Sequence, residues 1–281
     1  MTPTLSAGIG LKPEHYAAAA GCTAPGLWFE VHPENYFVAG GPRLAWLSAL
    51  RGERPIALHG VALSLAADSP PDDAHLHQLA ALAERIEPVL ISEHLAWSTW
   101  RGVYYPDLLP FARTRQALER IAANISHAQD RLGRSIAVEN PAHYLEIDGH
   151  EWAETAFLAE LAKRTGCALL LDINNVYVGA NNLGYSAKAY LDSFPGKAVA
   201  EIHLAGHSAD PSLGEALLID SHDMPVAAEV WALYQQVIER IGPRPTLIER
   251  DSNLPSFGEL MAEREIANDL LRRGEQLARA A

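Results

Sequence analysis

Cysteine is scarce in this chain, which has only Cys22 and Cys167 among its 281 residues. Two isolated cysteines are too few for a disulfide framework or a C-x-x-C site, so burial in the core is their expected role. The sequence also lacks a basic and then apolar N-terminal segment that would direct secretion, and no apolar run approaches the length of a membrane span. These absences predict a cytoplasmic protein.

Basic residues are also few relative to acidic ones. Asp and Glu outnumber Lys and Arg by 35 to 22, which gives a formal net charge of −13. No basic run is longer than a pair such as Arg272-Arg273. Because nucleic acids and anionic membranes are bound by faces that neutralise phosphates, we expect neither to be a partner.

The chain does contain a repeated unit, in which a short apolar run with a polar end precedes a longer amphipathic stretch. Eight apolar runs fit this description, at residues 6–10, 27–31, 55–60, 89–94, 135–140, 168–174, 199–206 and 245–251. The stretches between them predict helices over residues 72–86, 112–133, 154–166 and 228–242. Three of these helices end at a glycine suited to a C-cap: Gly133, Gly166 and Gly242.

Continuous apolar strands separated by helices indicate a parallel sheet that is covered on both faces. Eight such units with no Pro/Gly-rich linker predict an α/β fold, a (β/α)₈ TIM barrel that forms a single domain over residues 1–281. A doubly wound open sheet is the alternative, because the first run, SAGIG, is short and rich in glycine.

Polar residues end almost every predicted strand. In a (β/α)₈ barrel the catalytic groups come from the C-terminal strand ends and the loops that follow them. Residues at these positions are Glu30, His32, His59, Glu93, His94, Glu139, Asn140, Asp172, Asn174, Asn175, His203, His207, Glu249 and Asp251, with Asp220 and His222 in the long connection after the seventh strand. We therefore expect carboxylates and imidazoles from six or seven elements to converge at one mouth of the barrel.

A single histidine or glutamate at a strand end is usually a satisfied core or rim residue, so the number of these groups carries the argument. Four carboxylates, those of Glu139, Asp172, Asp220 and Glu249, would repel one another in a buried mouth unless a cation lay among them. Imidazole and carboxylate ligands suit iron, zinc and manganese alike, and bridging carboxylates favour more than one ion. Histidines away from the strand ends, at 75, 77, 127 and 150, are expected to be structural.

The ordered set of strand-end residues resembles two known families. It resembles the ligand order of the trinuclear-zinc apurinic endonucleases, which are (β/α)₈ barrels. It is more similar to the multinuclear non-haem iron oxidases that modify ribosomally made peptides, the family that includes the methanobactin-forming enzyme. The second match runs almost end to end, through GIGLKPEHY (8–16), FEVHPENYF (29–37), LHGVALSL (58–65), ISEHLAWS (91–98), VENPAHYL (138–145), LLLDINNVYV (169–178), EIHLAGHS (201–208), DSHD (220–223) and LIERDSNLPSF (247–257).

This resemblance implies an enzyme that holds two or three iron ions and uses dioxygen to oxidise a residue, usually cysteine, of a precursor peptide. It also implies a small partner protein that presents the peptide. The metal ligands that it assigns are His59, His94, Glu139, Asp172, Asn175, His203, Asp220, His222 and Glu249. Asn175 departs from the histidine that some members carry at this place, which implies a third metal that is loosely held or absent.

Other residues near the ligands are assigned supporting roles. We expect Glu30, Glu93, Asn140, Asn174 and Asp251 to orient ligands or relay protons. Asp251 and His207 are the candidates for acid–base catalysis near the substrate, with rim solvation as the alternative for both. An aromatic group, Trp97, Trp100, Tyr104 and Tyr105, follows the fourth strand and either walls a peptide groove or packs against a helix.

Two other classes of function stay open. One is a zinc-dependent phosphodiesterase, endonuclease-like or sugar-isomerase-like barrel enzyme, although the acidic charge argues against a DNA substrate. The other is a non-catalytic metal-binding or interaction protein, which would not need so many supporting carboxylates. The residue types alone do not distinguish iron from zinc.

Overall fold

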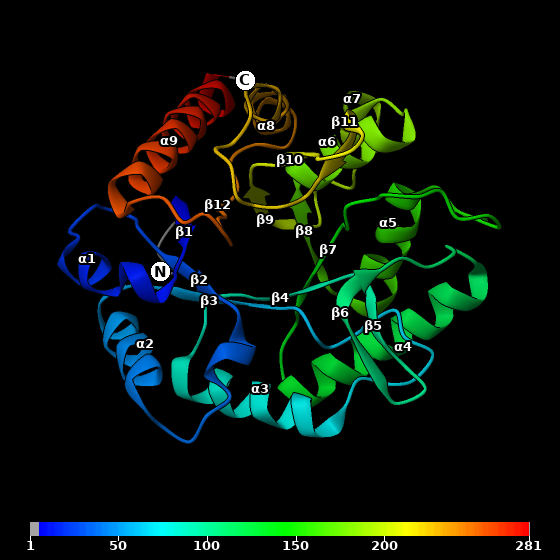
Figure 1. The fold of residues 1–281 in the computed structure, drawn as a ribbon, viewed down its shortest axis with the longest axis horizontal. Helices are drawn as coiled ribbons and strands as arrows, with labels where there is room; N and C mark the ends of the chain where they lie inside the picture. The colour runs from blue at the N-terminus through cyan, green and yellow to red at the C-terminus, as the bar shows by residue number, and fades with distance from the viewer. Residues whose placement is uncertain (1–5, 281) are drawn as a thin grey trace. The chain divides into compact units, whose positions relative to one another are not determined.

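The structure is a computed structural model that describes residues 6–280. Eight strands form a closed barrel in the order β1-β12-β9-β8-β7-β4-β3-β2 (Figure 1), so the predicted (β/α)₈ fold is confirmed and the open sheet is wrong. Each strand lies inside its predicted apolar run: β1 (Ala7–Gly10), β2 (Phe29–Val31), β3 (Ile56–Gly60), β4 (Ile91–His94), β7 (Ala137–Glu139), β8 (Ala168–Asp172), β9 (Val199–Leu204) and β12 (Thr246–Ile248).

Helices follow the barrel strands and include the four that the sequence predicts. Gly133 and Gly166 end two of them with φ of 65° and 71°, the left-handed conformation that glycine adopts without strain. The α-helices are α1 (Tyr16–Gly21), α2 (Pro42–Glu53), α3 (Asp73–Ile86), α4 (Arg115–Leu132), α5 (Glu154–Thr165), α6 (Ile173–Leu183), α7 (Ala187–Ser193), α8 (Ala228–Ile241) and α9 (Phe257–Ala280), and the short 3₁₀ helices are η1 (Pro13–His15) and η2 (Pro33–Tyr36). No helix within residues 6–280 is long and apolar enough to cross a membrane.

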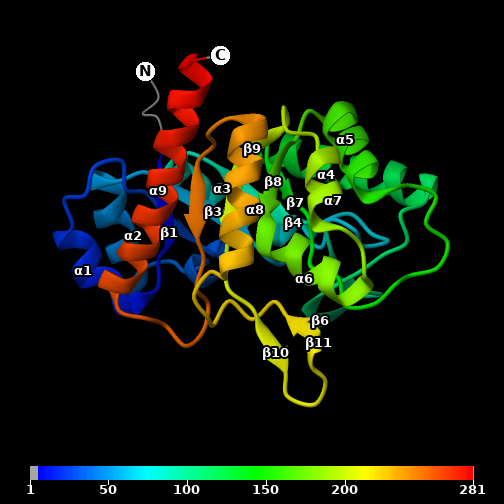
Figure 2. The ribbon, with the colours of Figure 1, turned by 90° about the horizontal axis from the view of Figure 1, so that it is seen from above.

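Two antiparallel hairpins that the sequence analysis did not predict lie in the connections after β4 and β9. The first pairs β5 (Trp97–Trp100) with β6 (Val103–Leu109), and the second pairs β10 (Ser208–Asp210) with β11 (Gly214–Ile219). Figure 2 shows β10 and β11 extending away from β9 and α8. These connections follow the C-terminal ends of barrel strands, where functional loops of this fold lie.

The contacts of the chain divide it into two compact units. The first holds the described residues of 1–30, 142–145 and 171–281, and the second holds residues 31–141 and 146–170. In the first unit β12 pairs in parallel with both β1 and β9. In the second unit β4 pairs in parallel with both β3 and β7.

The short strand β1 is held by side chains of α9. The buried guanidinium of Arg264 donates to the carbonyl oxygen of Ala7 at 2.6 Å, and the amide oxygen of Asn268 accepts from the nitrogen of Ala7 at 3.0 Å. Gly8 lacks a side chain because a Cβ there would collide with the indole of Trp28. The hydrogen bonds from α9 to Ala7 and the absence of a side chain at Gly8 therefore explain why the short run SAGIG forms a barrel strand.

Candidate metal centre

Three predicted ligands meet in the second unit. His59, His94 and Glu139 end the neighbouring strands β3, β4 and β7, and the parallel register places His94 directly opposite Glu139. Oε2 of Glu139 lies 3.1 Å from Nε2 of His59 and 3.2 Å from Nε2 of His94. The two Nε2 atoms lie 3.3 Å apart, so three ligand atoms share one small volume.

The hydrogen bonds made by Nδ1 of His59 and Nδ1 of His94 show that these two nitrogens carry a hydrogen. Nδ1 of His94 donates to the carbonyl oxygen of Gly60 at 2.9 Å, because a carbonyl can only accept. Nδ1 of His59 lies 2.8 Å from Oγ of Ser92, whose hydroxyl donates to the carbonyl oxygen of Leu58. In its neutral form each ring would therefore direct an Nε2 lone pair toward the Glu139 carboxylate. Three converging lone pairs repel one another and suit a divalent metal, so the donor set fits one.

The side chain of Glu93, the residue before His94 on β4, helps to hold His94 in position. Its Oε1 accepts from the backbone nitrogen of His94 at 3.0 Å, and its Oε2 accepts from the nitrogen of Leu63 at 3.2 Å. Burial raises the pKa of this carboxyl well above its usual value, and the nearby Glu34 and Glu139 charges add to the effect. A Cβ on Gly60 would collide with Oε2 of Glu93, so a larger residue there would have to displace this carboxylate.

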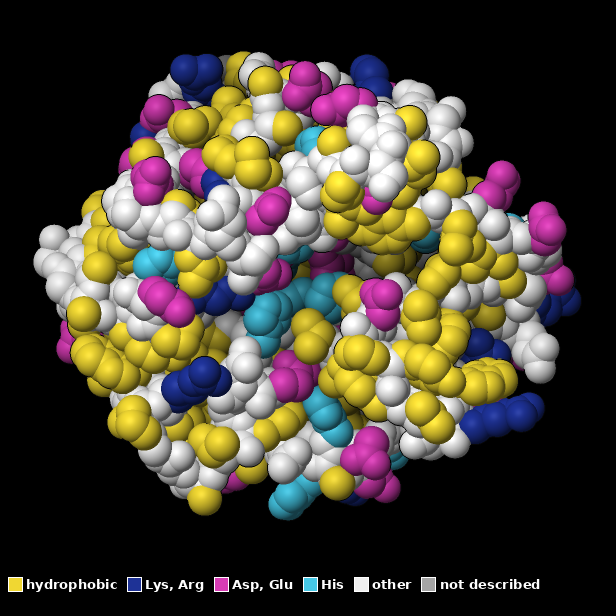
Figure 3. Space-filling view, viewed as in Figure 1, with side chains coloured by type: hydrophobic (Ala, Val, Ile, Leu, Met, Phe, Trp, Pro, Cys, Tyr) yellow, Lys and Arg dark blue, Asp and Glu magenta, His cyan; other side chains and the backbone are white. Residues whose placement is uncertain are grey.

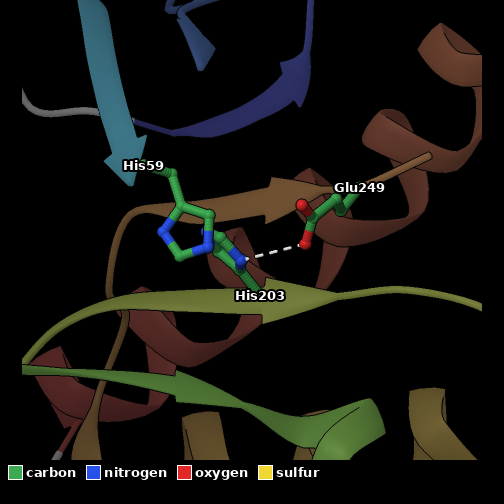
Figure 4. A group of neighbouring side chains, drawn as sticks. All are labelled: His59, His203 and Glu249. Atoms are coloured by element: carbon green, nitrogen blue, oxygen red, sulfur yellow. Dashed lines mark ion pairs between the residues drawn. The ribbon is translucent and has the colours of Figure 1, made fainter. Parts of the chain in front are cut away.

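A second group of predicted ligands gathers in the first unit, at the ends of β9 and β12. Nδ1 of the buried His203 lies 3.2 Å from Oε2 of Glu249 (Figure 4, which also draws His59). The same carboxylate oxygen lies 3.5 Å from Nδ1 of His222. Burial disfavours the charged form of each ring, but the surrounding carboxylates outweigh it and raise the pKa of His203 and of His222 well above the usual value.

The loop that carries Asp220 and His222 is held in a strained conformation. His222 has φ of 49°, in the left-handed region that residues with a side chain rarely adopt. Its backbone nitrogen donates to the carbonyl oxygen of Gly206 at 3.1 Å, and its carbonyl oxygen accepts from the nitrogen of Asp251 at 3.0 Å. The loop passes so close to Gly206 that a Cβ there would overlap the carbonyl group of Met224.

The strained loop places the imidazole of His222 between carboxylates. Its Nε2 lies 2.8 Å from Oδ1 of Asp220, and its Nδ1 lies 3.2 Å from Oδ2 of Asp251. The other oxygen of Asp251 pairs with Nζ of Lys12 at 2.5 Å. Asp251, a predicted acid–base residue, thus lies against a predicted ligand and is about one-third exposed.

His207, the other predicted acid–base residue, is linked to the predicted ligand Asp220 through the side-chain amide of Asn174. Nδ2 of Asn174 donates to Oδ1 of Asp220 at 2.6 Å, which leaves Oδ1 of Asn174 to accept from Nδ1 of His207 at 2.8 Å. The imidazole of His207 also packs on the ring of Tyr177, with centroids 5.0 Å apart. Burial lowers the pKa of His207, against the raising effect of Asp220 and two more distant glutamates.

Asp172 and Asn175 lie where β8 passes into α6, and both are buried. Oδ1 of Asp172 accepts from the backbone nitrogen of Asn175 at 2.6 Å, so this aspartate is the N-cap of α6. One carboxylate oxygen is used by the cap, and the second is the candidate metal ligand. Metal binding by this pair stays a prediction.

The sequence analysis missed Glu201, which is fully buried on β9 two residues before His203. The spacing in the sequence could have indicated it, because residues two apart on a strand, such as Glu201 and His203, face the same side. Lys12 was also missed as a partner of Asp251, although it lies in the GIGLKPEHY segment.

The aromatic group after β4 lies on the β5–β6 hairpin. Trp100, Tyr104 and Tyr105 are exposed there, with Val103 beside them, whereas Trp97 is half-buried and its indole nitrogen donates to the carbonyl oxygen of Pro110 at 2.6 Å. Figure 3 shows hydrophobic side chains over the region of this hairpin. A role in binding a peptide stays a prediction.

The fold and these side chains define a (β/α)₈ barrel protein with His and Glu groups able to hold metal ions. Comparison with known sequences identifies the family: the pattern described as "RiPP precursor modification enzyme MbnB/TglH/ChrH" matches residues 6–272. The chain belongs to this family of enzymes that modify ribosomally made precursor peptides.

Several relatives are similar over nearly their whole length. A UPF0276 protein of Caulobacter sp. (strain K31) is 62% identical over 96% of this chain and 97% of its own. A UPF0276 protein of Caulobacter vibrioides is 58% identical over 98% and 97%. Among solved structures, an L-ribulose 3-epimerase (TM-score 0.60, 14% identity, 99% and 98% covered) and a D-psicose 3-epimerase from Clostridium cellulolyticum H10 (0.58, 11%, 98% and 99%) share the fold alone.

Proposed function

We propose that this protein is a multinuclear non-haem iron enzyme that uses dioxygen to oxidise a residue, cysteine by preference, of a ribosomally made precursor peptide. Membership of the family implies the precursor peptide as substrate. The observation that carries the metal assignment is the convergence of two Nε2 lone pairs and one carboxylate oxygen in the group of His59, His94 and Glu139.

The ligands that we propose belong to both compact units, and we propose a single domain over residues 1–281. The C-terminal strand ends of a closed (β/α)₈ barrel are where catalytic groups of this fold lie, which supports the choice of strand-end residues. The ligand set is His59, His94, Glu139, Asp172, Asn175, His203, Asp220, His222 and Glu249. Asn175 offers a neutral amide oxygen, which binds a hard cation more weakly than a carboxylate and gives the third metal a lower occupancy.

When bound by these residues, iron would supply the redox chemistry by which dioxygen takes electrons from a substrate thiol. The protein's own contribution is to hold ligand geometry and to move protons. His207 donates from Nδ1 to Asn174, so its Nε2 can accept a proton from the substrate. Asp251 lies at the partly exposed rim, where its carboxylate contacts Lys12 and His222, and it is the second candidate to accept a proton. A small partner protein that presents the peptide completes the proposal.

Metal content per chain, measured by elemental analysis on anaerobically purified protein, tests this function first. Mössbauer and paramagnetic resonance spectra before and after exposure to oxygen form the second part. We expect two or three irons that change oxidation state, followed by oxygen consumption when a precursor peptide encoded beside the gene is added. Zinc that persists during expression with excess iron would overturn the oxidase and favour a hydrolase or isomerase.

A further inference from the structure

Strand β11 ends at Ile219, directly before the proposed ligand Asp220. In the two-stranded sheet of β10 and β11, Leu218 lies opposite Ala209, so β10 covers one edge of β11 close to this aspartate. The N–H and C=O groups on the other edge of a strand also need hydrogen-bond partners. The residues that cover this other edge therefore decide how firmly the backbone next to Asp220 is held.

The side chain of Asn182, near the end of α6, covers this other edge. Its Oδ1 accepts from the backbone nitrogen of Leu218 at 2.8 Å, and its Nδ2 donates to the carbonyl oxygen of Leu218 at 3.0 Å. The same Nδ2 donates to the carbonyl oxygen of His143 at 3.1 Å. These three hydrogen bonds use both the oxygen and the NH₂ group of the amide. One side chain thus joins α6, β11 and the segment that contains His143.

Tyr144, in that same segment, contacts the backbone of the ligand residue itself. Its phenol oxygen accepts from the backbone nitrogen of Asp220 at 3.0 Å. Asn182 and Tyr144 therefore hold the chain at two points, Leu218 and Asp220, through backbone atoms. The carboxylate of Asp220 is directed elsewhere, with Oδ1 2.8 Å from Nε2 of His222.

We propose that Asn182 and Tyr144 are positioning residues that hold Asp220 in place as a metal ligand. This inference rests on the proposed metal centre. Each of the four hydrogen bonds joins a neutral amide or phenol to a backbone atom, so none of them depends on the ionisation of a side chain. A ligand that is already held in position loses less conformational freedom when a metal binds, which raises the affinity.

Two substitutions remove these hydrogen bonds and leave every proposed ligand unchanged. Tyr144→Phe removes the hydroxyl alone, and Asn182→Ala removes all three bonds of the amide. We expect each metal-free variant, titrated with Co²⁺, to bind one equivalent about 10-fold more weakly, the lower end of the effect of residues that orient metal ligands. The visible absorption spectrum of bound Co²⁺ should shift toward that of Asp220→Ala.

Tyr234→Phe is the matched control in the same compact unit. The phenol of Tyr234 forms a buried hydrogen bond with Oγ1 of Thr246 at 2.8 Å. Its loss should lower the melting temperature and leave the affinity for Co²⁺ unchanged. A double-mutant cycle gives a readout that a merely structural role would not produce. In a protein that already carries Asp220→Ala, Asn182→Ala should weaken Co²⁺ binding no further.

The outcomes separate this inference from the proposed centre. If Asp220→Ala binds Co²⁺ with wild-type affinity, the proposed centre is wrong at this residue and the positioning role falls with it. If Asp220→Ala weakens binding but Asn182→Ala and Tyr144→Phe do not, the positioning role alone is overturned. An equal effect of Asn182→Ala with and without the Asp220 side chain would also overturn it, because that effect would come from the fold. Tyr144→Phe removes a single oxygen atom, so it carries the test even if Asn182→Ala fails to fold.

Discussion

Nε2 of His59 and Nε2 of His94 lie 3.3 Å apart, and each ring is locked in this orientation by a hydrogen bond from its Nδ1. Two imidazole nitrogens this close to each other and to a buried carboxylate form a donor set that suits a metal cation. This pair therefore marks the part of the proposed centre that the geometry supports most directly.

Glu139→Gln should remove metal from this group while the barrel stays folded. The amide keeps the volume of the side chain but loses the charge that the two imidazoles share. We expect the loss of about one metal equivalent in elemental analysis, with an unchanged circular dichroism spectrum. His127→Ala is the control, because His127 lies on α4 beside Asp73, and it should keep full metal content.

Asp220→Ala and His222→Ala should each lower bound metal in the same assay. The two side chains contact each other at 2.8 Å, so their losses should not add, and a double variant should resemble the more severe single variant. Unchanged metal content in both single variants would remove this loop from the site.

Chelation should lower thermal stability if metal binds mainly to the native state. At a free metal concentration 100 times the dissociation constant, one site stabilises the fold by about 2.7 kcal/mol. Differential scanning calorimetry with and without a chelator measures the shift. Identical melting curves for protein purified with metal would contradict the prediction.

Gly206→Ala should destabilise the loop that carries His222. The new Cβ would overlap the carbonyl group of Met224, and relieving such a clash costs about 1–3 kcal/mol. We expect a lower melting temperature together with reduced metal content. Gly52→Ala is the matched control, because that glycine lies in α2 with open space around it, and alanine there should stabilise the protein by up to about 1 kcal/mol.

Asn175→His should raise the occupancy of the weakest metal site. The position is buried at the first turn of α6, next to the Asp172 cap, and imidazole is a stronger donor to iron than an amide oxygen. Metal titration of wild type and variant under the same conditions gives the stoichiometry of each. An unchanged stoichiometry would count against Asn175 as a ligand position.

Much of the fold could be read from the sequence because its signals are local. Apolar runs of strand length, amphipathic helices and the C-cap glycines Gly133 and Gly166 depend on near neighbours in the chain. The two hairpins were missed, and in β6 the reason is that six of its seven residues are exposed, with none of the alternation that marks a half-buried strand.

The sequence by itself determined the (β/α)₈ fold and the kinds of ligand at the strand ends. Tertiary structure decided that His94 lies opposite Glu139 and that the carboxylate of Glu201 lies close to the imidazole of His203. It also decided that His222 adopts a strained backbone conformation next to Gly206. The physical reason is that these relationships depend on strand register and on backbone carbonyls from distant segments. Such partners fix which nitrogen of each imidazole is protonated, and residue type alone does not contain that information.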